Sequence, residues 1–312
     1  MPRSAPSVLR TLAAAAVLMG ALSVALVVVG QPSTAGAGAL TLPHPVPFSV
    51  VRHDQPPLKV LLVGDSMGGS LGVGLETLAS AYNVQLANAG HPGCSLSMDG
   101  AIQIVFENTS PGLPCVKNHP GALLAAWQSW VDAFRPDVVL YLARSDLLNQ
   151  LIGGHLTHVG RSRFNTWYAA RLRAGIGVLS SRGARVVLMT VPVSVEQTIN
   201  PRAADNPRRV AENGALLRMA AAATPGGVAT VYDLSQLLTP GFTYRASADQ
   251  LPLRCADGVH LTPDAGVVVA VDLFPRLWAL ADSHRVAGGG RWIHGAVPTT
   301  TPPWYQKLAG CT

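Results

Sequence analysis

The sequence contains few charged and few aromatic residues. Charged side chains make up 13% of the 312 residues and aromatic side chains 6%, although Lys and Arg outnumber Asp and Glu by 23 to 17. A nucleic-acid-binding surface needs a dense basic patch, often with aromatic residues between the cations, whereas the Arg residues here are scattered along the chain. We therefore expect no nucleic-acid partner. The 48% hydrophobic content is enough to bury a full core.

Common motifs for metals and nucleotides are also missing. The four cysteines include no C-x-x-C pair, which disfavours a zinc site. The Gly-rich stretch at residues 64–69 (GDSMGG) has neither the G-x-G-x-x-G spacing of a dinucleotide site nor the Lys of a phosphate-binding P-loop. We expect neither a metal nor an organic cofactor.

The longest hydrophobic run lies near the N-terminus. Residues 11–30 carry no charge and follow Arg3 and Arg10, and at about 1.5 Å per residue a helix of this length spans the ~30 Å hydrocarbon core of a bilayer. The basic flank stays in the cytoplasm, so the rest of the chain would lie outside. We expect residues 1–30 to form an uncleaved membrane anchor, with a signal peptide cleaved near Ala37 as the alternative. The Pro-, Gly- and Ala-rich residues 31–57 are predicted to be a linker.

If the chain is exported, its four cysteines are expected to form disulfides, because an even number of cysteines outside the cytoplasm usually does so. Cys94 and Cys115 flank one loop, and we expect them to pair. The second expected pair, Cys255–Cys311, would tie the C-terminal tail, residues 284–312, to the rest of the protein.

Short apolar runs alternate with helical patterns between residues 58 and 283. Runs typical of buried strands cover residues 59–63, 84–88, 138–142, 185–191 and 228–232. Helical patterns follow residue 66 and cover residues 122–134, 164–181, 207–223 and 262–281, the last opening with a Thr-Pro-Asp start signal. The alternation predicts one α/β domain with a five-stranded parallel sheet and helices on both faces.

Three residues have the chemistry of nucleophilic catalysis. Ser66 follows the first predicted strand directly, which places its hydroxyl at the carboxyl edge of the sheet, where ligands bind in open α/β folds. A serine nucleophile needs a general base. Just before the last helix, Asp257 and His260 offer an imidazole and a carboxylate that can orient it. Each signal is weak alone, and together they predict a Ser–His–Asp arrangement.

These motifs resemble the SGNH/GDSL hydrolase family over about residues 58–283. The likeness is carried by residues 64–66 (GDS), by Gly90 after the second strand and by residues 257–260 (DGVH). Gly93-Cys94, the Trp-containing helix before residues 135–139 (RPDVV) and the run DGVHLTP make the chain most similar to SGNH domains attached to membrane acyltransferases of actinobacteria. The resemblance implies a three-layer α/β/α sandwich of flavodoxin-like type.

The resemblance also implies roles for individual residues. Ser66 would be the nucleophile, His260 the base and Asp257 its orienting acid. The family's oxyanion hole uses the backbone N–H of the nucleophile, that of a Gly, here Gly90, and an Asn side chain in a Gly-x-Asn block. This chain has Ala143-Arg144-Ser145 instead. We expect Ser145 or Arg144 to replace the missing donor, with Asn149 as a further candidate, because losing one donor costs about 10²–10³ in kcat.

The sequence therefore predicts an exported serine esterase or O-acyltransferase. Its expected substrate is an acyl ester, with acetyl as the expected group, of a cell-envelope glycan or lipid. The alternative is a catalytically weak or inactive, membrane-tethered SGNH domain that binds an envelope glycan or an acyltransferase partner. The replacement of the Gly-x-Asn block, the third block of the family, by Ala143-Arg144-Ser145 favours this alternative. The choice between hydrolase and transferase, the acceptor and the oligomeric state stay open.

Overall fold

The computed structural model describes residues 55–98, 102–103, 121–195, 207–281 and 304–311. The predicted anchor (residues 1–30), nearly all of the linker (31–57), Cys115 and most of the tail (284–312) lie outside these residues. Among the described residues, no helix combines the length and the hydropathy needed to cross a bilayer.

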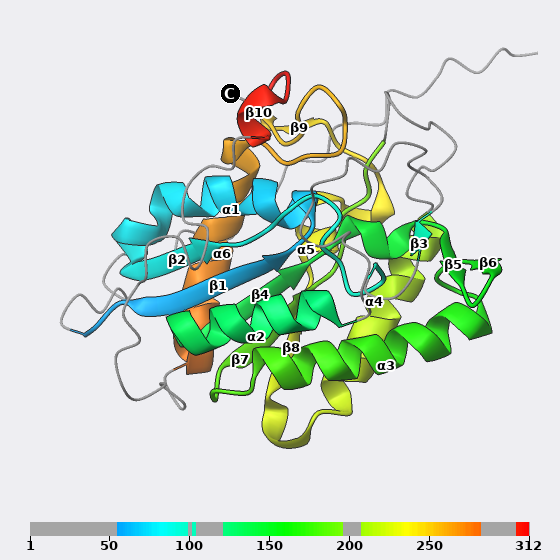
Figure 1. The fold of residues 1–312 in the computed structure, drawn as a ribbon. Coiled ribbons are helices and arrows are strands. Elements are labelled where there is room, and N and C mark those ends of the chain that lie inside the picture. Colours follow the sequence, from blue (N-terminus) through cyan, green and yellow to red (C-terminus); the bar gives the residue numbers. More distant parts are fainter. Residues whose placement is uncertain (1–54, 99–101, 104–120, 196–206, 282–303, 312) are drawn as a thin grey trace, which may run out of the picture. The chain divides into compact units, whose positions relative to one another are not determined.

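A five-stranded, fully parallel sheet forms the centre of the fold (Figure 1), and it confirms the prediction. Its strands lie in the order β2-β1-β4-β7-β8. Their bounds are Val84–Asn88 (β2), Leu58–Gly64 (β1), Val138–Leu142 (β4), Arg185–Met189 (β7) and Ala229–Tyr232 (β8). Every residue of β4 is buried, as expected for a Val- and Leu-rich strand covered on both faces.

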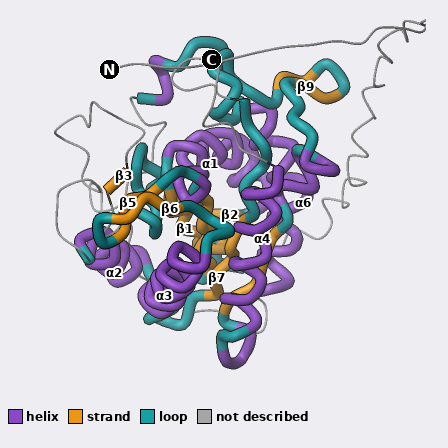
Figure 2. Tube along the Cα trace, turned by 90° about the vertical axis from the view of Figure 1, so that its right-hand side faces the viewer, coloured by secondary structure: helices purple, strands orange, loops and turns teal. Residues whose placement is uncertain are grey.

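Helices cover both faces of the sheet, which confirms the three-layer α/β/α prediction. Helices α1 (Ser66–Ala79) and α6 (Pro263–Ala281) pack together on one face. Helices α2 (Ala122–Phe134), α3 (Ser162–Leu179) and α4 (Pro207–Ala222) follow one another on the other face, with α2 and α3 side by side in both views (Figures 1 and 2). The close approach of α1 to α6 requires glycine, because a Cβ on Gly74 would lie 2.5 Å from the Cα of Gly266.

Several short elements have no counterpart in the sequence prediction. They are β3 (Ile102–Gln103), β5 (Gln150–Ile152) and β6 (His155–Thr157) in a small antiparallel sheet, the pair β9 (Ser247–Ala248) and β10 (Leu251–Pro252), and the short helix α5 (Leu234–Leu238). The missed strands have only two or three residues and the missed helix has five, which is too short for sequence patterns to reveal.

The sheet order brings several loops to one edge. The chain crosses from β2 past β1 to β4, so the strand order reverses at β1, and the carboxyl ends of all five strands point the same way. The crevice at such a reversal is the usual ligand site in open α/β sheets. The turn at residues 64–66, the segment after β2 and the segment after β4 all lie at this edge.

Candidate active site

Ser66 is the first residue of helix α1 and lies at the carboxyl edge of the sheet. The preceding Asp65 caps the helix, because its Oδ1 accepts a hydrogen bond from the backbone N–H of Met67 at 2.9 Å. Ser66 is the one residue between positions 60 and 70 that is not buried. The fold therefore offers the predicted nucleophile to solvent at the positive end of a 14-residue helix.

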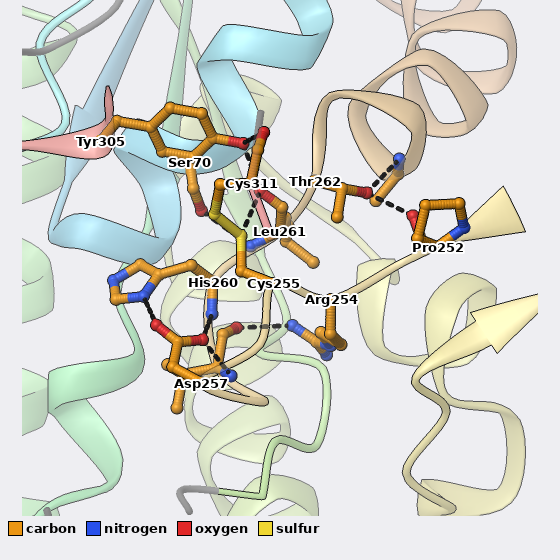
Figure 3. Close-up of a disulfide and its surroundings, with 12 residues drawn as sticks. Ser70, Pro252, Arg254, Cys255, Asp257, His260, Leu261, Thr262, Tyr305 and Cys311 are labelled. Carbon is orange, nitrogen blue, oxygen red and sulfur yellow. Dashed lines mark hydrogen bonds and ion pairs between the residues drawn. A yellow bond between two sulfur atoms is a disulfide. The ribbon is translucent and has the colours of Figure 1, made fainter. Parts of the chain in front are cut away.

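Asp257 and His260 form a hydrogen-bonded pair in the loop before α6 (Figure 3). The Oδ1 of Asp257 accepts the backbone N–H groups of Val259 at 2.8 Å and His260 at 3.0 Å, and its Oδ2 contacts the Nδ1 of the His260 ring. Burial acts to raise the pKa of Asp257, but the hydrogen bonds from His260 and Val259 outweigh it and lower the pKa to about 2. The carboxylate is therefore ionised and fixes the orientation of the imidazole.

Two residues outside the predicted motifs, Arg254 and Ser70, hold this loop in place. The buried Arg254 donates to the carbonyl oxygens of Val259 and Val193, each at 2.9 Å, and so joins the loop to the segment after β7. The backbone N–H of Leu261 donates to the Oγ of Ser70 at 3.1 Å. Ser70 lies one helical turn after Ser66 on the same face of α1. The loop that carries His260 therefore contacts helix α1 one turn after Ser66.

The C-terminal segment is bonded to the same loop. A disulfide joins Cys255 to Cys311 (Figure 3), which confirms the predicted pair. The hydroxyl of Tyr305 donates to the carbonyl oxygen of Leu261 at 2.9 Å. Cys94 is buried, and its predicted partner Cys115 lies outside the described residues, so that bond stays a prediction.

The third block has a different arrangement from the one expected for an oxyanion donor. The backbone N–H and the hydroxyl of Ser145 both donate to the Oδ2 of Asp65, at 2.6 and 2.7 Å. Asp65 thus links the start of α1 to the short 3₁₀ turn Arg144–Leu147 after β4. In this structure, Ser145 positions the helix that carries Ser66, and its predicted role toward an oxyanion would require the hydroxyl to leave Asp65.

Two other predicted donors, Arg144 and Gly90, are also bonded to other residues. The Nε of Arg144 donates to the Oγ of Ser194 at 2.8 Å, and the guanidinium is largely buried. The backbone N–H of Gly90 donates to the side chain of Asn88 at 3.2 Å. The side-chain oxygen of Asn149 is buried without a hydrogen-bond partner among the described residues. Roles for these groups in an oxyanion hole stay predictions.

A family model for SGNH domains that occur fused to AT3 domains matches residues 39–273, which is most of the chain. The chain belongs to the SGNH family. The recognition made from the GDS, Gly90 and DGVH motifs is confirmed, and the predicted class, a serine ester hydrolase or O-acyltransferase of SGNH type, agrees with this membership.

The solved structures that match this chain are distant in sequence. A protein from Bacteroides fragilis described as an acylhydrolase is 16% identical, with a TM-score of 0.47 and coverage of 77% of this chain and 92% of that one. The C-terminal catalytic domain of peptidoglycan O-acetyltransferase A from Streptococcus pneumoniae is 16% identical (TM-score 0.41, coverage 75% and 100%). A carbohydrate esterase of family 3 from Talaromyces cellulolyticus is 18% identical (TM-score 0.42, coverage 72% and 99%). A search among curated proteins gave no match.

In this SGNH domain, the buried side chain of Asp146 holds the third block, which follows β4, in place. Asp146 accepts hydrogen bonds from the hydroxyls of Tyr141 and Tyr168, each at 2.5 Å, and from the backbone N–H of Ser97 at 3.0 Å. Burial raises the pKa of Asp146, although these hydrogen bonds act against it. The network holds the turn after β4 rigidly against α3. No group of three or more His, Cys, Asp or Glu side chains in the described part of the chain is arranged to hold a metal ion.

Replacing Ser145 tests whether this residue positions helix α1 through Asp65 or donates a hydrogen bond to the oxyanion. If it acts through Asp65, Ser145→Ala lowers the free energy of unfolding by about 1.5–3 kcal/mol, the value of a hydrogen bond to a charged group, and changes kcat less than tenfold. Urea unfolding and ester hydrolysis measure the two effects. Ser129→Ala, at an exposed position on α2, is the matched control. A fall of about 10²–10³ in kcat with little loss of stability would instead make Ser145 an oxyanion donor.

Proposed function

We propose that the chain is a serine esterase or O-acyltransferase that acts on acyl esters, with acetyl the expected group, of a cell-envelope glycan or lipid. One observation carries the proposal: the imidazole of His260 is oriented by an ionised Asp257, and its Nε2 is buried with no hydrogen-bond partner among the described residues. The loop holding this base contacts α1 through Ser70, one helical turn after Ser66.

The geometry supports a two-step acyl transfer. With Nδ1–H donated to Asp257, Nε2 is the bare nitrogen and accepts the proton of Ser66 as its Oγ attacks the ester carbonyl. The charged imidazole, stabilised by Asp257, then gives this proton to the departing alcohol. Water or an acceptor hydroxyl resolves the acyl-enzyme by the reverse sequence. Ser66 and His260 are not hydrogen-bonded to each other in this structure, and such contacts often tighten only when substrate binds.

The start of α1 supplies the first oxyanion donor. The backbone N–H of Ser66 is at the first helical position, where no intrahelical acceptor exists, and it lies at the positive end of the helix dipole. Gly90 and Arg144 are the further proposed donors. To act, Gly90 must release Asn88 and Arg144 must turn from Ser194.

A location outside the cytoplasm is part of the proposal. The uncharged segment at residues 11–30, preceded by Arg3 and Arg10, supports a membrane anchor, or a secreted protein if the chain is cleaved near Ala37. The Cys255–Cys311 disulfide supports an oxidising compartment. The envelope glycan or lipid as substrate follows from export and from the family resemblance.

A second candidate function is a binding domain with little or no activity. It is favoured by the engagement of Ser145, Gly90 and Arg144 with other residues, because an oxyanion hole reduced to one donor would be a weak catalyst. Such a domain would bind an envelope glycan or an acyltransferase partner and would catalyse no reaction itself.

Hydrolysis of p-nitrophenyl acetate by the purified full chain separates the two candidates. Ser66→Ala is expected to lower kcat/KM by about 10³-fold or more, because the variant lacks the nucleophile. Ser80→Ala, an exposed serine at the other end of α1, is the control and should match the wild type. A wild-type protein no faster than Ser66→Ala would refute esterase activity on this ester and favour the binding domain.

A further inference from the structure

Two buried nitrogen atoms, one in the loop before α6 and one in the C-terminal segment, have no hydrogen-bond partner among the described residues. They are the Nε2 of His260 and the Nε1 of Trp304. The two rings are neighbours, with centroids 5.7 Å apart and planes inclined by 51°. Buried polar atoms in folded proteins are nearly always hydrogen-bonded, so an adjacent pair without partners points to a ligand.

The two nitrogens are complementary in their hydrogen-bonding character. His260 places its Nδ1–H against the carboxylate of Asp257, which leaves Nε2 as an acceptor. The indole N–H of Trp304 can only donate. A hydroxyl group offers a donor and an acceptor on a single atom, whereas an ester carbonyl or a carboxylate only accepts and an ammonium only donates. The pair therefore suits the hydroxyl of an alcohol or of water.

Trp304 is held between helix α1 and the loop that carries Asp257 and His260. On one side, the next residue, Tyr305, donates to the carbonyl of Leu261, and the Cys255–Cys311 disulfide fixes the segment to the loop (Figure 3). On the other side, the Cζ2 of Trp304 would lie 2.7 Å from a Cβ placed on Gly69. Nε1 belongs to the same edge of the indole as Cζ2. That edge therefore faces the first turn of α1, which begins with Ser66.

We propose that Trp304 Nε1–H and His260 Nε2 together hold the alcohol or water hydroxyl that exchanges with Ser66. This inference rests on the proposed function and adds a residue that positions the acceptor. In deacylation, the hydroxyl oxygen forms a bond to the acyl carbon and its proton passes to Nε2. The bond between that carbon and Ser66 Oγ then breaks, and the proton returns to Oγ. In acylation, the departing alcohol occupies the same place. Trp304 keeps its proton throughout.

Trp304→Phe tests the proposal, because it keeps a ring against His260 and Gly69 and removes only the N–H. kcat/KM reports the acylation step, in which ethyl acetate releases an alcohol that needs a proton and p-nitrophenyl acetate releases a phenolate that does not. We expect the variant to lose about tenfold in kcat/KM for ethyl acetate, the value of one hydrogen bond, and to stay within about twofold for p-nitrophenyl acetate. Trp167→Phe, a partly buried indole on α3, is the matched control and should change neither.

Two results would overturn the inference while leaving the proposed function intact. Unchanged kcat/KM for both esters would mean that the indole N–H does not contact the alcohol. An equal loss for both esters would mean that Trp304 only supports the loop. If the wild type itself hydrolyses neither ester faster than Ser66→Ala, the proposed function fails first and this inference falls with it.

Discussion

Asp257→Asn is expected to lower kcat for ester hydrolysis by about three to four orders of magnitude while the protein stays folded. The Oδ1 of the new amide can still accept the backbone N–H groups of Val259 and His260, so the loop keeps its shape. The amide nitrogen then faces the Nδ1 of His260, donor against donor. The imidazole must take the other tautomer, with its proton on Nε2, where it can no longer accept the proton of Ser66.

The carboxylate of Asp257 carries its negative charge throughout the ordinary pH range. Burial acts to raise the pKa of Asp257, but its hydrogen bonds with His260 and Val259 lower it to about 2, so the carboxylate stays ionised from about pH 4 upward. At any pH above about 4, Asp257→Asn therefore removes a full negative charge, and kcat with p-nitrophenyl acetate measures the resulting loss. Asp249→Asn is the control, because Asp249 is exposed and its positive φ of 47° is one that Asn tolerates. A variant at position 257 that keeps more than about a tenth of wild-type kcat would contradict the proposed role.

The framework of the fold could be predicted because its signals are local. The three central strands of the main sheet, β1, β4 and β7, are short Val- and Leu-rich runs, and such runs bounded by turn residues have few alternatives to a buried strand. The start of α6 is equally local, since the hydroxyl of Thr262 accepts the N–H of Ala265 as expected for a helix cap. The pairing of Asp257 with His260 could also be predicted from the sequence, because the two residues are three positions apart in one loop.

The environment of the site could not be predicted, because it depends on contacts between distant segments. The sequence placed Ser145 at the correct edge of the sheet, but its direction is set by Asp65, eighty residues earlier in the chain. Ser70 meets Leu261 across 191 positions, and nothing in the pattern of α1 marks this serine. Trp304 reaches His260 only because the disulfide at Cys311 and the hydrogen bond of Tyr305 fold the C-terminal segment back. Side-chain direction at a sheet edge is a tertiary property.

Gly64→Ala is expected to destabilise the protein by at least about 4 kcal/mol, the range reached only by severe core defects. Gly64 ends β1 just before Ser66 and has a φ of +138°, which L-residues rarely adopt. A Cβ at this position would lie 1.9 Å from the carbonyl oxygen of Leu142 and 2.7 Å from its carbonyl carbon. Leu142 is the β4 residue paired with Gly64, and its oxygen also accepts the N–H of Asp65 at 3.3 Å. Neither backbone can move without opening the centre of the sheet.

Gly121→Ala separates the two causes of this loss of stability, the positive φ and the clash of the added Cβ. Gly121 also has a positive φ, of +90°, but a Cβ there would meet nothing within 4 Å. Its replacement should cost only the conformational term, about 1–2 kcal/mol. Urea unfolding followed by circular dichroism measures both variants, and the fraction recovered in soluble form covers the case in which Gly64→Ala does not fold. If the two alanine variants unfold within about 1 kcal/mol of each other, the contact between β1 and β4 at the catalytic turn is looser than this structure has it, because the clash with Leu142 would then add nothing to the conformational cost.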